Sequence, residues 1–252
     1  DQLDIDVILF DEAQLSDDYS VRGLYYDSVI RRCVTYFPNS KLVFAYPFID
    51  NPEVQYVKNR IEYDQEDFQK FTQRNVGQIF YSYKDTQFFH FGLEADRSGN
   101  KVKINYDPVN KVLLAGGSVL VYCSKASIYD KSIFTKFIPY MRLCPTVNDP
   151  IANELIEKFR LLIGASASNR GDYSSRMVNM LKHGIVVHHG SLPLAARYII
   201  EEFTKKGFCR ICFATSTLEQ GINMPFDMVW IEKFEPGKPL NVKNLIGRAG
   251  RS

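Results

Sequence analysis

The chain has 252 residues, of which 45% are apolar and 24% charged, and its formal net charge is +2. This length suits one large domain or two medium ones, and the composition is ordinary for a soluble globular protein. The small net charge excludes a global basic field, so any nucleic-acid contact must come from a local groove and from backbone N–H groups. Since the sequence holds no apolar run of about 18 residues, no membrane span is expected.

The five cysteines, an odd number, argue against a disulfide framework and fit a reducing, cytoplasmic location. Cys209 and Cys212 form a CxxC within an apolar run that is typical of a strand. Residues three apart on a strand point to opposite faces and cannot share a metal ion. We therefore expect two packed thiols at this place.

The first predicted element is a strand over residues 7–10, a continuous apolar run of the kind found in parallel strands covered on both faces. The chain opens almost directly into this strand without a basic-then-apolar signal, which indicates a piece of a longer protein. A predicted helix follows, since apolar residues repeat there at helical spacing. They are Tyr26, Val29, Ile30, Cys33, Val34 and Phe37.

Pro38-Asn39-Ser40 ends this helix, and residues 41–46 are predicted as the next strand, which completes a βαβ unit. Residues 53–112 have a different character, rich in Tyr, Phe, Asp, Gln and Asn, with short alternating stretches at 78–83 and 87–91 and an exposed turn at 95–100. We interpret them as a connector with a small β-hairpin; an aromatic platform that stacks RNA bases is the alternative.

Strands and helices alternate again beyond the connector. Strands are predicted at 118–123, 185–188, 208–214 and 227–231. Helices are predicted at 127–140, 151–163 and 173–182, and a last one opens at Ser191-Leu192-Pro193, with Leu192, Ala195, Ile199 and Phe203 on one face. The alternation predicts the α/β class, as two parallel-sheet units joined by the connector. The expected divisions are 1–70, 71–112 and 113–252.

Two carboxylates directly follow the first strand, in the stretch Asp11-Glu12-Ala13-Gln14. Ligands of open α/β sheets bind at the carboxyl ends of strands, so this pair is well placed for chemistry. Asp11 can hold Mg²⁺ on the phosphates of a nucleotide, and Glu12 can polarise a water for attack on the γ-phosphate.

Two arginines stand three apart near the C-terminal end, Arg248 and Arg251, and a glycine lies beside each of them. The guanidinium group presents a fixed fork of donors that suits phosphate oxygens. The glycines let the backbone approach a neighbouring domain closely.

Hydroxyl and histidine residues follow two other strands. Thr215 and Ser216 can offer donors to a phosphodiester, or can simply cap a helix. His189 and Gly190 lie between a strand and a helix, and neither a carboxylate nor a cysteine stands at ligand spacing nearby. A helix N-terminus that meets a nucleic-acid phosphate is therefore favoured over a metal site.

The order DEAQ, HHGSL, ATSTLEQGINMP and NLIGRAGR resembles that of superfamily-2 helicases of the DEAD/DExH type, and most of all their Ski-like branch. Members of this branch include RNA and DNA helicases and motors of bacterial defence systems. The resemblance implies two RecA-like domains of the P-loop NTPase type, the first incomplete. It also implies ATP and Mg²⁺ as cofactors, single-stranded DNA or RNA gripped mainly by its backbone, and a possible partner subunit.

The resemblance assigns roles to the nucleotide-binding residues. Asp11 would bind Mg²⁺, Glu12 would activate the water, and Gln14 would relay between the nucleotide and the second domain. Gly221 and Asn223 would lie near the ATP ribose and phosphates.

The remaining implied roles concern the nucleic acid and the γ-phosphate. Thr215 and Ser216 would lie near the nucleic-acid backbone, and Arg248 and Arg251 would be the arginine fingers. Carboxylates of the first domain and arginines of the second would thus act on one nucleotide, and hydrolysis would drive movement along the strand.

The sequence departs from the family in three places. It holds no GxxxxGK[ST] phosphate loop, which we expect N-terminal to Asp1. Alignment on residues 51–53 puts Tyr46-Pro47-Phe48 where the family has Ser-Ala-Thr, and Asn244 stands where it prefers Gln. Two alternatives to a helicase or translocase are a non-catalytic clamp and a metal-dependent nuclease, of which the nuclease leaves the paired arginines unexplained.

Overall fold

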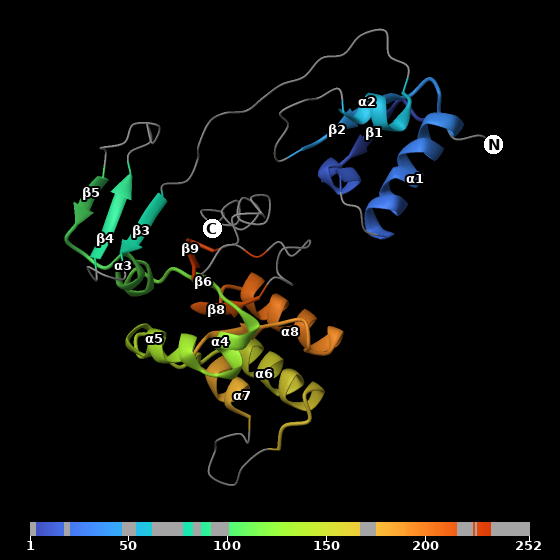
Figure 1. Ribbon diagram of the computed structural model, residues 1–252. Helices are drawn as coiled ribbons and strands as arrows, with labels where there is room; N and C mark the ends of the chain where they lie inside the picture. The colour runs from blue at the N-terminus through green and yellow to red at the C-terminus, as the bar shows by residue number, and fades with distance from the viewer. Residues whose placement is uncertain are drawn as a thin grey trace. The chain divides into compact units, whose positions relative to one another are not determined.

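The computed structural model describes residues 4–17, 21–46, 54–61, 78–82, 87–91, 101–166, 175–215, 224 and 226–232. The chain divides into two compact units, Asp1–Gln73 and Arg74–Ser252 (Figure 1). The three-part division expected from the sequence stays a prediction. No helix within the described ranges has the length and hydropathy of a membrane span.

The first unit contains the predicted βαβ arrangement. Strand β1 pairs in parallel with β2, Val7 opposite Lys41 and Phe10 opposite Phe44. The elements in chain order are β1 (Val7–Phe10), the 3-10 helix η1 (Ala13–Asp17), α1 (Val21–Tyr36), β2 (Lys41–Phe44) and α2 (Val54–Asn59).

Only one face of the β1–β2 sheet is covered by described residues. Phe10 stacks on Phe44 with ring centroids 5.0 Å apart, and Tyr26 and Tyr56 meet these rings edge-on from α1 and α2. Alternate residues of a strand point to opposite faces, so Val7 and Leu9 lie on the other side, where they are exposed. The prediction that β1 is covered on both faces is therefore not met in this part of the chain.

Helix α1 is confirmed, and of its predicted apolar residues Ile30 is buried, four are half-buried and only Val29 is exposed. Gly23, Asp27 and Ile30 are its buried residues, while Val29 is 51% exposed. The burial of Asp27, which the apolar pattern did not predict, has a physical reason, since its carboxylate lies 3.3 Å from the Lys58 ammonium of α2. A buried carboxylate needs such a partner, and the pair holds this side of the helix inward.

The predicted hairpin is confirmed and carries a third strand. β3 (Gln78–Ser82) runs antiparallel to β4 (Gln87–Phe91), which also pairs with β5 (Lys101–Ile104). The sequence prediction missed β5, a stretch of only four residues. The predicted turn at 95–100 lies outside the described residues.

The second unit is built on a four-stranded parallel sheet in the order β7-β8-β6-β9. All four strands were predicted: β6 (Val119–Tyr122), β7 (Ile185–His188), β8 (Ile211–Ala214) and β9 (Met228–Ile231). The helices around them are α3 (Pro108–Leu114), α4 (Lys125–Tyr129), α5 (Ser132–Met141), α6 (Pro150–Leu162), α7 (Arg176–Leu181) and α8 (Leu194–Lys205).

Alternate side chains of each strand enter two different cores. Val119 and Val121 point to the core closed by α3 and α5, which contains Leu113 and Phe137. Leu120 points to the opposite core, which is closed by α6, α7 and α8. The sheet is thus a middle layer between two helical layers, and the predicted α/β class is confirmed.

Two helix predictions differ from the structure. The helix expected over 127–140 is divided into α4 and α5, because Lys131 adopts a left-handed φ of 66° and the Asp130 carboxylate accepts the Ser132 N–H at 2.8 Å. The last helix begins after Pro193, and its buried row includes Ala196, Ile200 and the predicted Phe203, whereas the predicted Ile199 packs partly buried against the same core and Ala195 is exposed.

Candidate functional site

Asp11 and Glu12 lie at the carboxyl end of β1, in a turn that is held by their own groups. One oxygen of the exposed Asp11 carboxylate accepts the Glu12 N–H at 2.8 Å. Glu12 has a left-handed φ of 52°, and its carbonyl accepts the Leu15 N–H at 2.9 Å, at the start of η1. A left-handed conformation costs a non-glycine residue roughly 1–2 kcal/mol, so the surroundings must hold Glu12 in place.

Two residues of α1 that the sequence did not mark as functional approach this turn. The Tyr26 hydroxyl donates to the Asp11 carbonyl at 2.7 Å, and an Arg22 guanidinium nitrogen lies 3.8 Å from the Glu12 carboxylate. Burial, with the negative charge of Asp11 next, raises the pKa of Tyr26 to about 12, so this hydroxyl remains a donor. The sequence did contain a sign of this contact, because Arg22 and Tyr26 are four residues apart and therefore lie on one face of the helix that follows the carboxylates.

The carboxylate oxygens at this turn are suitable ligands for a magnesium ion that is bound to a nucleotide. Mg²⁺ prefers oxygen ligands and is usually held by one or two carboxylates together with phosphates and water. Asp11 supplies an exposed carboxylate with one oxygen not used by the Glu12 N–H. The described ranges contain no group of three His, Cys, Asp or Glu residues that could enclose a metal.

Gln14 follows on η1 and presents a buried acceptor. Its Oε1 atom has no hydrogen-bond partner among the described residues. An unpaired buried acceptor costs about 1–3 kcal/mol, which a donor from a bound group would recover. The predicted relay role of Gln14 remains a prediction.

The second unit gathers polar and aromatic side chains at the carboxyl edge of its sheet, after β6 and β7. The Lys125 ammonium lies 2.8 Å from the Ser191 hydroxyl and 5.7 Å from the centre of the Tyr129 ring. The rings of Tyr129 and His189 are 6.1 Å apart, and Gly190 is exposed beside them. The structure thus adds Lys125 and Tyr129 to the predicted His189 and Gly190.

The positions of Lys125 and Tyr129 in the sequence also point to this edge of the sheet. They follow the predicted strand 118–123, and ligands of open α/β sheets bind at the carboxyl ends of such strands. On the other side of the group, α8 starts without a side-chain cap, so its first N–H groups are not used by a capping side chain. Uncapped N–H groups at a helix start suit an anion.

Of the other predicted residues of the second unit, one is buried and the rest lie outside the described ranges. Thr215 follows β8, is 6% exposed, and donates its N–H to the His188 carbonyl at 3.3 Å. The residues that fall outside the described ranges are Ser216, Gly221, Asn223, Arg248 and Arg251.

His188 is a buried residue of the sheet and lies next to the exposed group. Its Nε2 atom is 3.2 Å from the Glu201 carboxylate of α8. Burial, and secondarily the charge of Arg197, lowers the pKa of His188 below its ordinary value, although Glu201 opposes this shift. We infer that His188 is neutral at pH 7 and supports the strand that carries His189.

This burial predicts a pH dependence of stability. Because the folded-state pKa of His188 lies below 6.5, the unfolded state binds the proton more readily, so stability is full above pH 6.5 and decreases as the pH falls toward the folded value. Thermal unfolding between pH 7.5 and pH 5.5 measures this loss of stability. His188→Gln should make the loss smaller, whereas His183→Gln, at an exposed position, should leave it unchanged. An unchanged slope in His188→Gln contradicts the assignment.

One prediction about the cysteines is wrong. Cys209 precedes β8 and is not part of the strand, so the alternation of a strand does not apply to it. Cys209 and Cys212 both enter the same core, and a hydrogen bond between them together with burial raises the pKa of Cys212. Both are free thiols, as expected.

The chain is similar to known helicases. Residues 158–252 match the helicase conserved C-terminal domain. The chain is 29% identical over 147 residues to the ATP-dependent DNA helicase Hel308 of Caldivirga maquilingensis, covering 54% of this chain and 19% of that protein. It is 40% identical over 81 residues to mouse DNA polymerase theta, covering 31% of this chain and 3% of that protein.

A further relative is the DExH-box ATP-dependent RNA helicase DExH12 of Arabidopsis thaliana, 32% identical over 88 residues, which are 31% of this chain and 4% of that protein. The chain therefore spans less than a quarter of the length of each of these relatives. Their names include both DNA and RNA helicases.

Proposed function

Because this chain belongs to the superfamily-2 helicases of the DExH type, we propose that the intact protein is an ATP-dependent helicase or translocase that acts on DNA or RNA. One observation carries the proposal most directly. Two carboxylates, Asp11 and Glu12, stand at the carboxyl end of a parallel strand, in a chain whose residues 158–252 match a helicase domain.

The proposed chemistry divides phosphoryl transfer among a few side chains. Mg²⁺ carried by ATP supplies charge neutralisation at the phosphates, and Asp11 holds it. Glu12 orients the attacking water and takes its proton, while Arg248 and Arg251 stabilise the negative charge that spreads over the γ-phosphate. Gln14 senses the state of the nucleotide.

Other assignments extend this proposal. Gly221 and Asn223 contact the ribose and phosphates, and Ser216 and Thr215 lie along the nucleic-acid backbone. The Ski-like branch, an intracellular location and a partner subunit are part of the same proposal. So is the division into a first RecA-like domain, a connector and a second RecA-like domain.

The experiment that tests the function measures ATP hydrolysis by the intact protein without nucleic acid, with single-stranded DNA and with single-stranded RNA. A motor should hydrolyse ATP faster with at least one of the two strands, and the preferred strand identifies the track. Binding of a strand without any turnover would replace the motor by the non-catalytic clamp. Absence of both activities contradicts the proposal.

The nucleic-acid grip should come from His189 and Gly190 together with Lys125 and Tyr129. A cation beside an aromatic ring pair can neutralise a phosphate while a base stacks on the rings. Contacts of this kind are tolerant of sequence and sensitive to salt.

We predict that Lys125→Ala weakens single-strand binding by about 5–10-fold at moderate salt, since it removes one phosphate contact. The slope of log affinity against log salt concentration should become shallower by roughly 0.7–1. Titration of a labelled single strand at several salt concentrations measures both values. Lys206→Ala, at an exposed position after α8, is the matched control. An unchanged salt slope in Lys125→Ala removes this residue from the interface.

A further inference from the structure

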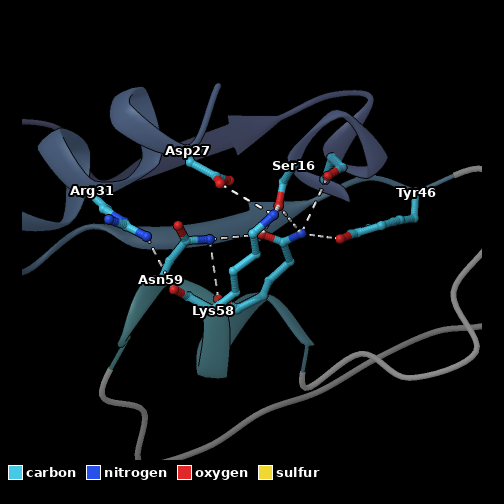
Figure 2. Close-up of polar contacts among 8 residues, drawn as sticks. Ser16, Asp27, Arg31, Tyr46, Lys58 and Asn59 are labelled. Carbon is cyan, nitrogen blue, oxygen red and sulfur yellow. Dashed lines mark hydrogen bonds and ion pairs between the residues drawn. The ribbon is translucent and has the colours of Figure 1, made fainter. Parts of the chain in front are cut away.

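The first unit contains a buried polar network that none of the proposed roles uses (Figure 2). Its centre is Gln55 of α2, whose amide nitrogen lies 2.8 Å from the Ser16 hydroxyl, 3.4 Å from the Ala13 carbonyl and within hydrogen-bond distance of the Tyr46 hydroxyl, and shares its two N–H groups among these acceptors. The Gln55 amide oxygen accepts from Asn59 at 3.0 Å. Ser16, Tyr46, Gln55 and Asn59 are called the Gln55 network below.

The network is buried in a unit that has few buried apolar side chains among its described residues. Ser16 and Gln55 are each 1% exposed, whereas the buried apolar side chains among the described residues of this unit are Phe10, Ala13 and Ile30. Buried amides and hydroxyls are costly unless paired, and replacing all partners with apolar groups of the same shape can be nearly neutral. Stability alone therefore does not require these polar groups, but a need to fix one geometry does.

The segment that the network fixes is the one directly after Glu12. Ala13 follows Glu12 and is held on both sides, since its N–H donates to the Ala45 carbonyl at 3.0 Å and its carbonyl accepts from Gln55. Ala45 in turn donates to the Phe10 carbonyl at 2.9 Å. Ser16 anchors the next turn of η1 to the same amide.

Glu12 needs this support because of its backbone. Its left-handed φ of 52° is stable only if neighbouring contacts overcome the cost of that conformation. The Asp11 carboxylate and the Leu15 N–H act on Glu12 from within the turn, and the Gln55 network acts on the residues that follow it. Loss of the network would release η1 and let Glu12 relax to an ordinary backbone conformation.

We propose that Gln55 and Tyr46 are positioning residues that hold Glu12 in the geometry needed to activate water. Gln55 joins the end of β2, through Tyr46, to the turn that carries the carboxylates. Neither residue contacts the reacting atoms. This inference rests on the proposed ATPase function for its kinetic consequence, but its geometric part stands on the contacts alone.

The test uses Gln55→Met and Tyr46→Phe in the intact protein, which keep side-chain size and remove the polar atoms. The control is Tyr36→Phe, an exposed tyrosine of α1. Hydrogen exchange is measured at the amides of Ala13 and Leu15, whose N–H groups are bonded in the native turn. ATP hydrolysis is measured at a temperature well below the unfolding midpoint of every variant.

We expect faster exchange at both amides in Gln55→Met and, to a smaller extent, in Tyr46→Phe. The kcat for ATP should fall by about 10–100-fold in Gln55→Met, as for a misplaced catalytic group, with KM within about twofold. A merely structural role would lower the unfolding midpoint without this separation of kcat from KM. Tyr36→Phe should change neither quantity.

Different failures have different meanings. Unchanged exchange in Gln55→Met overturns the positioning role, whether or not the protein hydrolyses ATP. If the wild type is active and Gln55→Met exchanges faster but keeps its kcat, the positioning role is also overturned, because the turn would then move without affecting Glu12. An inactive wild type overturns the proposed function instead, and the exchange data still decide whether the network holds the turn.

Discussion

Glu12→Gln in the intact protein should lower the nucleic-acid-stimulated kcat for ATP hydrolysis by about 10²–10⁴-fold, the usual contribution of a general base. The amide has the shape of the carboxylate but cannot take a proton from the attacking water. The side chain at this position is 42% exposed and lies at the carboxyl end of β1, so the substitution introduces no buried unpaired group. Affinity for ATP should change little, because Glu12 acts on the water.

Two measurements separate this effect from damage to the fold. Steady-state hydrolysis gives kcat, and titration with a fluorescent ATP analogue gives the affinity. Asp4→Asn is the matched control, since it makes the same chemical change at an exposed carboxylate just before β1. Turnover within about twofold of the wild type in Glu12→Gln would show that another group activates the water.

The strands of the second unit were predictable because each is a short apolar run, and all but the half-buried β9 are covered on both faces. Val119, Leu120 and Val121 are all fully buried, and so is every residue of β7 and β8. Such runs identify a covered parallel strand from local sequence alone. The break between α4 and α5 was not predictable, because it depends on a left-handed Lys131 within a stretch that keeps helical spacing.

The burial of Asp27 on α1 was not predictable for a different reason. Periodicity assumes that apolar residues face inward, and here Asp27 is buried because Lys58 reaches it from a separate helix. The partner of a buried charge lies elsewhere in the chain and gives no local signal. The same holds for Gln55, whose partners Ser16 and Tyr46 belong to other segments.

The acidic pair at the candidate site was predictable, since Asp11 and Glu12 directly follow an apolar strand. The left-handed backbone of Glu12 and the contact from Tyr26 were not, because they depend on the packing of α1 and η1. Sequence therefore predicted the candidate catalytic groups, and the structure shows what holds them. The reason is chemical: catalysis needs particular types of side chain, whereas many different residues can hold those side chains in place.

Arg251→Ala should give the largest loss, about 10³–10⁵-fold in kcat, which is the contribution of an arginine finger in related phosphoryl transfer. The expectation rests on sequence, because Arg248 and Arg251 lie outside the described residues. Arg251→Lys should remain strongly impaired, since an ammonium cannot form the two parallel hydrogen bonds of a guanidinium fork. Arg142→Ala, at an exposed position after α5, is the matched control.

The double variant Arg248→Ala, Arg251→Ala tests whether the two arginines act together. Groups that stabilise the same charge are not additive, so the double variant should lose little more than the worse single variant. Additive losses would instead indicate independent roles, with one arginine acting on a different group. If Arg251→Ala hydrolyses ATP at the wild-type rate while Glu12→Gln does not, the carboxylate role stands and the finger role is wrong, because each substitution removes a different part of the same reaction.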